Sequence, residues 1–193
     1  PEIDFKQLRI EKRTMGFEEV MVVADSLVEV KERCIIAGTE ILLEPGVIIE
    51  SGSMIKAPAI IGANSEVRQG AYLRGNVIVG EHCTCGHTTE IKNSIFMNHT
   101  EAGHFAYVGD SVLGSYVNLG AGTKLANLQF RNKKAKLKQD FPHISLKLDG
   151  ELFHTGTAKI GTFFGDHGEA GCNSVIAPAV FLGYESWVMP NMT

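Results

Sequence analysis

The feature that most constrains this chain is an apolar residue at every sixth position from Leu43 onward. The series reads Leu43, Ile49, Ile55, Ile61, Val67, Leu73, Val79, Cys85, Ile91 and Met97. Four residues after each of these positions the side chain is nearly always small or β-branched, as at Ser53 and Ala59. Three such hexapeptides make one triangular coil of about 18 residues, whose apolar positions stack on those of the next coil. The sequence therefore predicts an all-β, left-handed parallel β-helix of hexapeptide repeats.

Two interruptions divide this repeat. The apolar frame stops after Met97 and resumes at Tyr107, Leu113, Leu119 and Leu125, which predicts an inserted loop near residues 98–106. A second insertion, near 130–157, carries a lysine cluster and the hairpin dipeptide Asp149-Gly150. The frame then returns at Phe164, Ala170, Ile176, Leu182 and Val188. We expect a β-helix over residues 37–193 with two insertions, and a cap segment over residues 1–36, which do not fit the frame.

Length and composition limit the function classes. The 193 residues are enough for one domain, and a net charge of −4 gives no general reason to expect nucleic-acid binding. No apolar run approaches the roughly 18 residues of a membrane span, and no signal-peptide pattern opens the chain. The four cysteines match no zinc ribbon or CxxC pair, so we expect buried thiols and a reducing, cytoplasmic location.

Two stretches of the chain carry a family resemblance. Residues 102–127 read AGHFAYVGDSVLGSYVNLGAGTKLAN, and residues 89–94 read TEIKNS. Both closely resemble the active-site region of the acetyltransferase domain in the bifunctional glucosamine-1-phosphate acetyltransferase/N-acetylglucosamine-1-phosphate uridyltransferase family. The segment after residue 127 is similar to a variant in archaeal and related sugar nucleotidyltransferases. The family's nucleotidyltransferase domain has no counterpart in this sequence, so no pyrophosphorylase chemistry is expected from it.

The resemblance implies a reaction in which acetyl-CoA acetylates the amine of an amino-sugar 1-phosphate, with no metal in this domain. His104 matches the catalytic base, which suits an imidazole whose ordinary pKa of about 6.5 lies near the operating pH. Glu90 matches a carboxylate that orients this base, although a surface strand residue is an equal reading. The Ala121 N–H matches the donor that stabilises the tetrahedral oxyanion. Cys172 stands near the coenzyme, where the family tends to have serine.

The same resemblance implies an acceptor site. Lys92 and Tyr107 match residues that contact the sugar phosphate, and Tyr107 also suits a packing role. Asn118 and Asn127 match side chains that bind the sugar hydroxyls or the amine; asparagines in this fold also stabilise turns. The remaining phosphate-contacting residues are an arginine and a lysine. Arg68 matches the arginine by motif and Arg74 by its distance from Lys92, and the motif favours Arg68. Lys133 matches that lysine by its spacing from Asn127, unless the lysine cluster is only a solvated face.

Two other functions remain open. One is a non-catalytic oligomerisation or regulatory module of a sugar nucleotidyltransferase system. The other is a zinc enzyme similar to the γ-class carbonic anhydrases, because His82 and His87, like His99 and His104, repeat the spacing of that family's ligands. The acetyltransferase reading implies a homotrimer with sites in the clefts between parallel β-helices.

Overall fold

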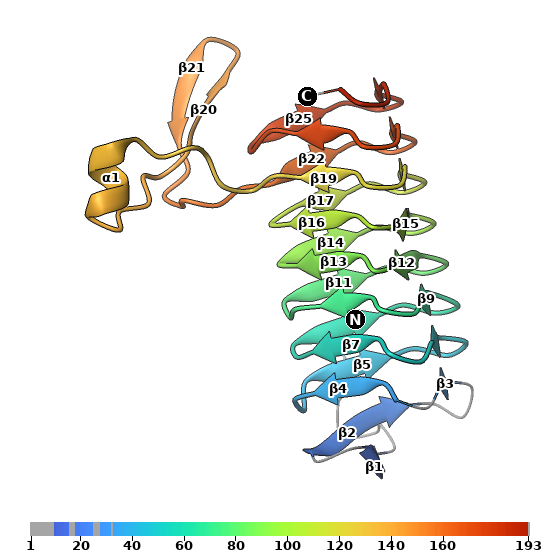
Figure 1. The fold of residues 1–193 in the computed structure, drawn as a ribbon. Helices are drawn as coiled ribbons and strands as arrows, with labels where there is room; N and C mark the ends of the chain where they lie inside the picture. The colour runs from blue at the N-terminus through green and yellow to red at the C-terminus, as the bar shows by residue number, and fades with distance from the viewer. Residues whose placement is uncertain (1–9, 16–17, 25–27, 32, 193) are drawn as a thin grey trace.

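The computed structural model of the chain, which describes residues 10–15, 18–24, 28–31 and 33–192, is a parallel β-helix with one projecting arm (Figure 1). Short strands form three sheets around a common core: sheet A with nine strands, sheet B with eight and sheet C with seven. Each coil contributes one strand to each sheet in the order A, B, C, and successive coils pair in parallel. The predicted all-β, left-handed parallel β-helix is confirmed.

The strands are two to seven residues long. Sheet A contains β1 (Ile10–Met15), β2 (Glu18–Ala24), β5 (Ile41–Leu43), β8 (Ala59–Ile61), β11 (Val77–Val79), β14 (Ser94–Phe96), β17 (Val112–Leu113), β22 (Thr162–Phe164) and β25 (Val180–Leu182). Sheet B contains β3 (Glu29–Val30), β6 (Ile48–Ile49), β9 (Glu66–Val67), β12 (Thr84–His87), β15 (Glu101–His104), β18 (Asn118–Leu119), β23 (Glu169–Ala170) and β26 (Trp187–Val188). Sheet C contains β4 (Ile35–Ala37), β7 (Met54–Lys56), β10 (Tyr72–Leu73), β13 (Glu90–Lys92), β16 (Tyr107–Gly109), β19 (Lys124–Leu125) and β24 (Val175–Ile176).

The core is a column of apolar side chains along the axis of the solenoid. The predicted frame from Leu43 to Ile91 lies inside it, with every member at most 1% exposed. Small hydroxyl residues occupy the tight corners and donate hydrogen bonds to backbone carbonyls there; Thr89 Oγ1, for example, donates to the Ala102 carbonyl at 3.0 Å. Each coil thus buries its apolar face against its neighbours, as solenoid repeats require.

The insertion expected near residues 98–106 is wrong. These residues belong to a regular coil, in which β15 pairs in parallel with β12 and β18. The buried residues are Phe96 and Val108, whereas Met97 is 46% exposed and Tyr107 points outward. The steps from Ile91 to Phe96 and from Val108 to Leu113 are each five residues instead of six. Two one-residue shortenings therefore shift the six-residue frame as a four-residue insertion would.

Both shortenings lie at the C–A corner, which we define as the turn that leads from each strand of sheet C into sheet A. In an earlier coil this turn uses two residues with positive φ, Gly75 at 92° and Asn76 at 52°. In the next coil Asn93 alone takes that conformation, at 45°, and in the following coil Asp110 does so at 52°. Asn and Asp tolerate this left-handed region better than other side chains.

The chain forms an arm in the region where the insertion over residues 130–157 was expected. It leaves the solenoid after β19 and contains helix α1 (Lys133–Leu137) and the antiparallel hairpin β20 (Ser145–Leu148) and β21 (Glu151–His154). Asn132 caps the helix, and its side chain accepts a hydrogen bond from the Ala135 N–H. The arm projects sideways from the upper coils (Figure 1). Within the described residues no helix has the length and apolar character needed to cross a membrane.

The segment expected as a cap is partly described. Strands β1 and β2 form an antiparallel pair, and β2 joins sheet A beside β5. Strands β3 and β4 already pair in parallel with β6 and β7, so the first coil begins before residue 37. Residues 1–9, 16–17, 25–27 and 32 of that expected cap lie outside the described residues.

Candidate functional site at the two edges of sheet C

Most of the predicted site residues lie at the two edges of sheet C. One edge is the C–A corner. The other is the B–C corner, the turn that leads from each strand of sheet B into sheet C. The outer face of sheet C spans the distance between them, about three residues or roughly 10 Å.

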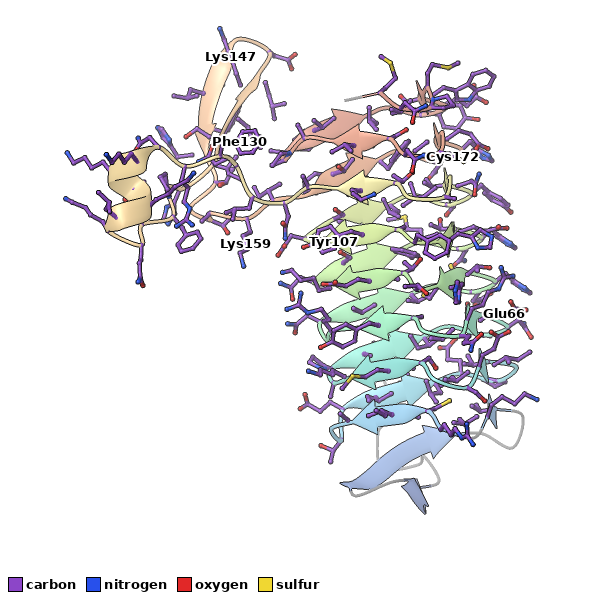
Figure 2. The ribbon with its side chains drawn as sticks, in the orientation of Figure 1. Glu66, Tyr107, Phe130, Lys147, Lys159 and Cys172 are labelled. Atoms are coloured by element: carbon purple, nitrogen blue, oxygen red, sulfur yellow. The ribbon has the colours of Figure 1, made fainter. Side chains whose placement is uncertain are left out.

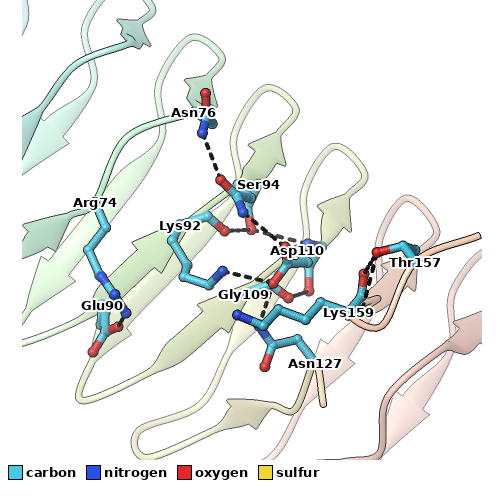
Figure 3. A network of polar contacts seen from close by, with 12 residues as sticks. Arg74, Asn76, Glu90, Lys92, Ser94, Gly109, Asp110, Asn127, Thr157 and Lys159 are labelled. Carbon is cyan, nitrogen blue, oxygen red and sulfur yellow. Dashed lines mark hydrogen bonds and ion pairs between the residues drawn. The ribbon is translucent and has the colours of Figure 1, made fainter. Parts of the chain in front are cut away.

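A chain of side-chain hydrogen bonds runs up the C–A corner (Figure 3). Asn76 Nδ2 donates to Asn93 Oδ1 at 2.9 Å, and Asn93 Nδ2 donates to Asp110 Oδ1 at 3.0 Å. From the coil above, Asn127 Nδ2 donates to Asp110 Oδ2. The two shortened turns bring these residues into one column, with Asp110 as its central acceptor.

Asp110 also fixes the position of Lys92. The Lys92 ammonium lies 3.0 Å from Asp110 Oδ2, and the two side chains are only 13% and 15% exposed. Burial opposes ionisation of Asp110, but hydrogen bonds from Asn93, Asn127 and Lys92 outweigh it, so the pKa of this carboxyl lies below its ordinary value. Lys92 is therefore held beside an ionised carboxylate at the edge of sheet C.

Arg74, Glu90 and Tyr107 extend this cluster across the outer face of sheet C. Arg74 Nη1 lies 2.6 Å from Glu90 Oε1, in a half-exposed ion pair. A Cβ atom on Gly109 would lie 2.6 Å from the Tyr107 hydroxyl oxygen and 2.8 Å from Asn127 Nδ2, so both groups approach because residue 109 is glycine. Burial, followed by the charges of Glu90 and Asp110, raises the pKa of Tyr107 and keeps its hydroxyl protonated.

The B–C corner carries a second set of predicted residues, stacked one coil apart. The Gly122 N–H donates to the His104 carbonyl at 3.0 Å, and the Asn173 N–H donates to the Ala121 carbonyl at 2.8 Å. These repeated bonds place Ala121 over His104, and Cys172 over Ala121. The imidazole of His104 is exposed, and among the hydrogen bonds of the described residues none uses the Ala121 N–H as donor. The expected base and the expected oxyanion donor are thus adjacent.

Four predicted residues have other surroundings. Glu90 is paired with Arg74, and no hydrogen bond between Glu90 and His104 exists in the described part of the chain. Arg68 forms its ion pair with Glu66 at 3.0 Å, away from the Lys92 cluster, whereas Arg74 belongs to that cluster. Two others lie outside sheet C and its corners: Asn118 on the outer face of sheet B, hydrogen-bonded to Glu169 at 3.1 Å, and Lys133 on the arm.

The histidines considered as zinc ligands are on two different corners. His82 stacks on His99 between sheets A and B, with ring centroids 5.0 Å apart, while His87 pairs in register with His104. Within the residues that the structure describes, no group of three or more His, Cys, Asp or Glu side chains could hold a metal ion. Side chains are drawn on the solenoid in Figure 2, which labels Tyr107 of sheet C and Cys172 of the B–C corner.

The sequence interpretation missed Asp110, although it lies inside the stretch that carries the family resemblance. Its signal is the dipeptide Gly109-Asp110 at the point where the repeat shortens by one residue. Glycine admits the neighbouring polar groups, and the aspartate takes the left-handed turn position. A frame that follows the shortening would have placed Asp110 one coil above Asn93.

Comparison with known proteins supports the predicted relationship. Residues 55–145 match the family model described as GMPPB C-terminal domain. The bifunctional sugar-1-phosphate nucleotidylyltransferase/acetyltransferase of Sulfurisphaera tokodaii is 34% identical over 88% of this chain and 40% of its own length. The bifunctional protein GlmU of Methanococcus aeolicus is 31% identical over 80% of this chain and 36% of its own.

A solved structure of UDP-N-acetylglucosamine acyltransferase from Francisella novicida matches 86% of this chain and 62% of that one, at 15% identity and a TM-score of 0.36. That likeness is too distant to bear on function. This chain spans 40% or less of the length of the two bifunctional relatives. Over 80% or more of its length, the chain is related in sequence to the bifunctional sugar-1-phosphate nucleotidylyltransferase/acetyltransferase and to GlmU.

Proposed function

We propose that this chain transfers an acetyl group from acetyl-CoA to the amine of an amino-sugar 1-phosphate, with glucosamine 1-phosphate as the default acceptor. The observation that carries the proposal is the division of sheet C into two chemically different edges. Cations and amides gather at the C–A corner, and an exposed imidazole lies beside a free backbone N–H at the B–C corner. An acceptor on the outer face of sheet C would direct its phosphate toward Lys92, Arg74 and Tyr107 and its amine toward His104.

The chemistry follows from these positions. His104 takes a proton from the amine while the amine nitrogen attacks the thioester carbonyl. The Ala121 N–H donates to the oxyanion of the tetrahedral intermediate, one coil above the base. Collapse of the intermediate breaks the carbon–sulfur bond, and the imidazolium returns the proton to the departing thiolate. Cys172, one further coil along the same column, is assigned to the coenzyme.

We assign the acceptor's phosphate to Lys92, Arg74 and Tyr107. We assign Asn127, at the C–A corner, to the hydroxyls or the amine of the sugar. Arg74 is preferred to Arg68 because it shares the cluster with Lys92 and Glu90. We assign the Arg74–Glu90 pair to orientation of the guanidinium.

We further propose that the sites are completed in a homotrimer. Asn118 faces outward from sheet B and Lys133 stands on the arm, so neither can reach the sheet C face of its own chain and both are assigned to a neighbouring subunit. An apolar row along the outer face of sheet A supplies a surface for assembly. The row consists of Leu42, Ile60, Ile78, Ile95, Val112, Phe163 and Phe181, each paired in register with the next. A single-chain mass by light scattering would contradict this arrangement.

We place the protein in the cytoplasm, because Cys34, Cys83 and Cys85 are buried free thiols, as expected in a reducing compartment.

The test is a thiol-release assay with acetyl-CoA and a panel of amino-sugar phosphates, on the wild-type chain and on His104→Ala. We expect turnover with at least one acceptor, and a fall of about 10²–10⁴-fold in the variant, because general-base catalysis contributes that much. His87→Ala, on the same corner one coil below, is the matched control and should keep wild-type turnover. Equal turnover by His104→Ala would remove that residue from the mechanism. No turnover with any acceptor would favour the second candidate, a non-catalytic oligomerisation module, for which the apolar row on sheet A is the supporting observation.

A further inference from the structure

The segment in which the arm returns to the solenoid, residues 157–161, is fixed tightly against the C–A corner. Lys159 forms an antiparallel bridge with Leu128. The Ile160 N–H donates to the Asn127 carbonyl at 3.1 Å, and the Gly161 N–H donates to the Asp110 carbonyl at 2.7 Å. The two residues that follow Lys159 are thus hydrogen-bonded to the backbone of Asn127 and of Asp110.

Gly161 makes this close return possible. A Cβ atom there would lie 2.0 Å from Ser111 Oγ and 2.1 Å from the Gly109 carbonyl oxygen, so a larger residue would push the segment away from the corner. The position of Lys159 is therefore set by backbone packing rather than by its own flexible side chain.

The Lys159 side chain extends over Asp110 and Asn127 in Figure 3. It lines an open pocket of about 410 Å³ between the arm and the corner, together with Asn93, Asp110, Phe141, Thr157 and Ala158. In the described part of the chain its ammonium forms no ion pair, and its only neighbouring carboxylate in the pocket, Asp110, is already paired with Lys92.

The charges at this corner leave one cation uncompensated. Glu90 pairs with Arg74, and Asp110 pairs with Lys92, so each of these cations faces a carboxylate. Lys159 adds a positive charge that no carboxylate balances. A site that must attract a phosphate dianion needs such a charge, because pairing within the protein weakens the field of the other two cations.

We infer that Lys159 is a substrate-binding residue, which contacts the phosphate of the acceptor from the arm side, opposite Lys92. The inference rests on the proposed function for the identity of the ligand, and it goes beyond that function by adding a residue from the arm of the same chain. Lys133, by contrast, serves only the site of a neighbouring subunit. The arm then acts as a fixed clamp over the phosphate end of the acceptor.

Phosphate binding can be measured without acetyl transfer. We would titrate inorganic phosphate, and separately glucosamine 1-phosphate, into the full chain by isothermal titration calorimetry. Lys159→Met should raise Kd for both ligands about tenfold or more, because a charge-assisted hydrogen bond is lost. Lys159→Arg should stay close to wild type. Lys138→Met, an exposed arm lysine at the end of α1, is the matched control and should change Kd less than twofold.

The outcomes separate this inference from the proposed function. Unchanged Kd in Lys159→Met, or a wild-type chain that binds neither ligand, would overturn the role of Lys159. The thiol-release assay adds an independent reading. If the wild-type chain turns over and Lys159→Met keeps its KM for the acceptor, the transferase assignment stands and the clamp is refuted. If Lys159→Met weakens phosphate binding in a chain that never turns over, the anion site stands and the transferase assignment fails.

Discussion

The two edges of sheet C show how one solenoid supports two arrangements of polar residues. The B–C corner keeps its register through successive coils, so His104, Ala121 and Cys172 form an even column. The C–A corner loses one residue in each of two coils and then admits the arm, and there the polar side chains interlock around Asp110. A regular corner stacks residues at a fixed spacing, whereas an irregular corner lets side chains from different coils converge.

The largest expected effect is on stability, and it concerns the buried position of the first shortened coil. Phe96→Ala should lower the free energy of unfolding by about 3–5 kcal/mol, because Phe96 is fully buried and truncation leaves a cavity. Met97→Ala, at the neighbouring exposed position, should change it by less than about 0.5 kcal/mol. Urea denaturation followed by circular dichroism measures both. A larger loss for Met97→Ala would restore the unbroken six-residue frame and contradict the shortened coil.

The six-residue apolar frame predicts part of the buried core from the sequence. From Leu43 to Ile91 the six-residue spacing alone identifies the buried positions, because every coil there has the same length. It fails at Phe96, since a turn made by Asn93 alone is one residue shorter than a turn made by Gly75 and Asn76. Periodicity cannot reveal this shortening, because the residue that the unbroken frame predicts as buried, Met97, and the residue that is buried, Phe96, are both apolar.

The candidate site was predictable to a similar extent. The matched stretches identify Lys92, Tyr107 and Asn127, which the fold brings to one corner. They do not identify Lys159, because the return of the arm is set by Gly161 and by backbone bonds between residues far apart in sequence. The choice between Arg68 and Arg74 likewise needed the structure, since it depends on which arginine shares a corner with Lys92.

A smaller effect concerns the pH dependence of the irregular corner. The pKa of Asp110 is lower in the folded chain, so its ionised form stabilises the fold above the unfolded value of about 3.9, and this contribution disappears as the pH falls through the folded pKa. Asp110→Asn should therefore lower the free energy of unfolding at pH 7 by an amount on the order of 1 kcal/mol, as for a partly exposed ion pair. The change is measured as a lower urea midpoint. The difference from wild type should shrink as the pH falls below the unfolded value and through the lowered folded pKa.

Asp149→Asn provides the control for that experiment, because Asp149 lies at the exposed turn between β20 and β21. Its urea midpoint should follow the wild-type curve at every pH. A deficit of Asp110→Asn that does not shrink as the pH falls below the unfolded value of about 3.9 would show that the carboxylate charge does not stabilise the corner.

We have proposed that the two edges of sheet C perform different parts of one reaction. Steady-state kinetics of acetyl transfer to an amino-sugar 1-phosphate, with His104→Ala and Lys92→Met measured side by side, can separate the two roles. We predict that His104→Ala lowers kcat and leaves the acceptor KM near wild type, while Lys92→Met raises the acceptor KM about tenfold or more with a smaller change in kcat. The same change in kcat and KM for both variants would contradict a division of labour between the two edges.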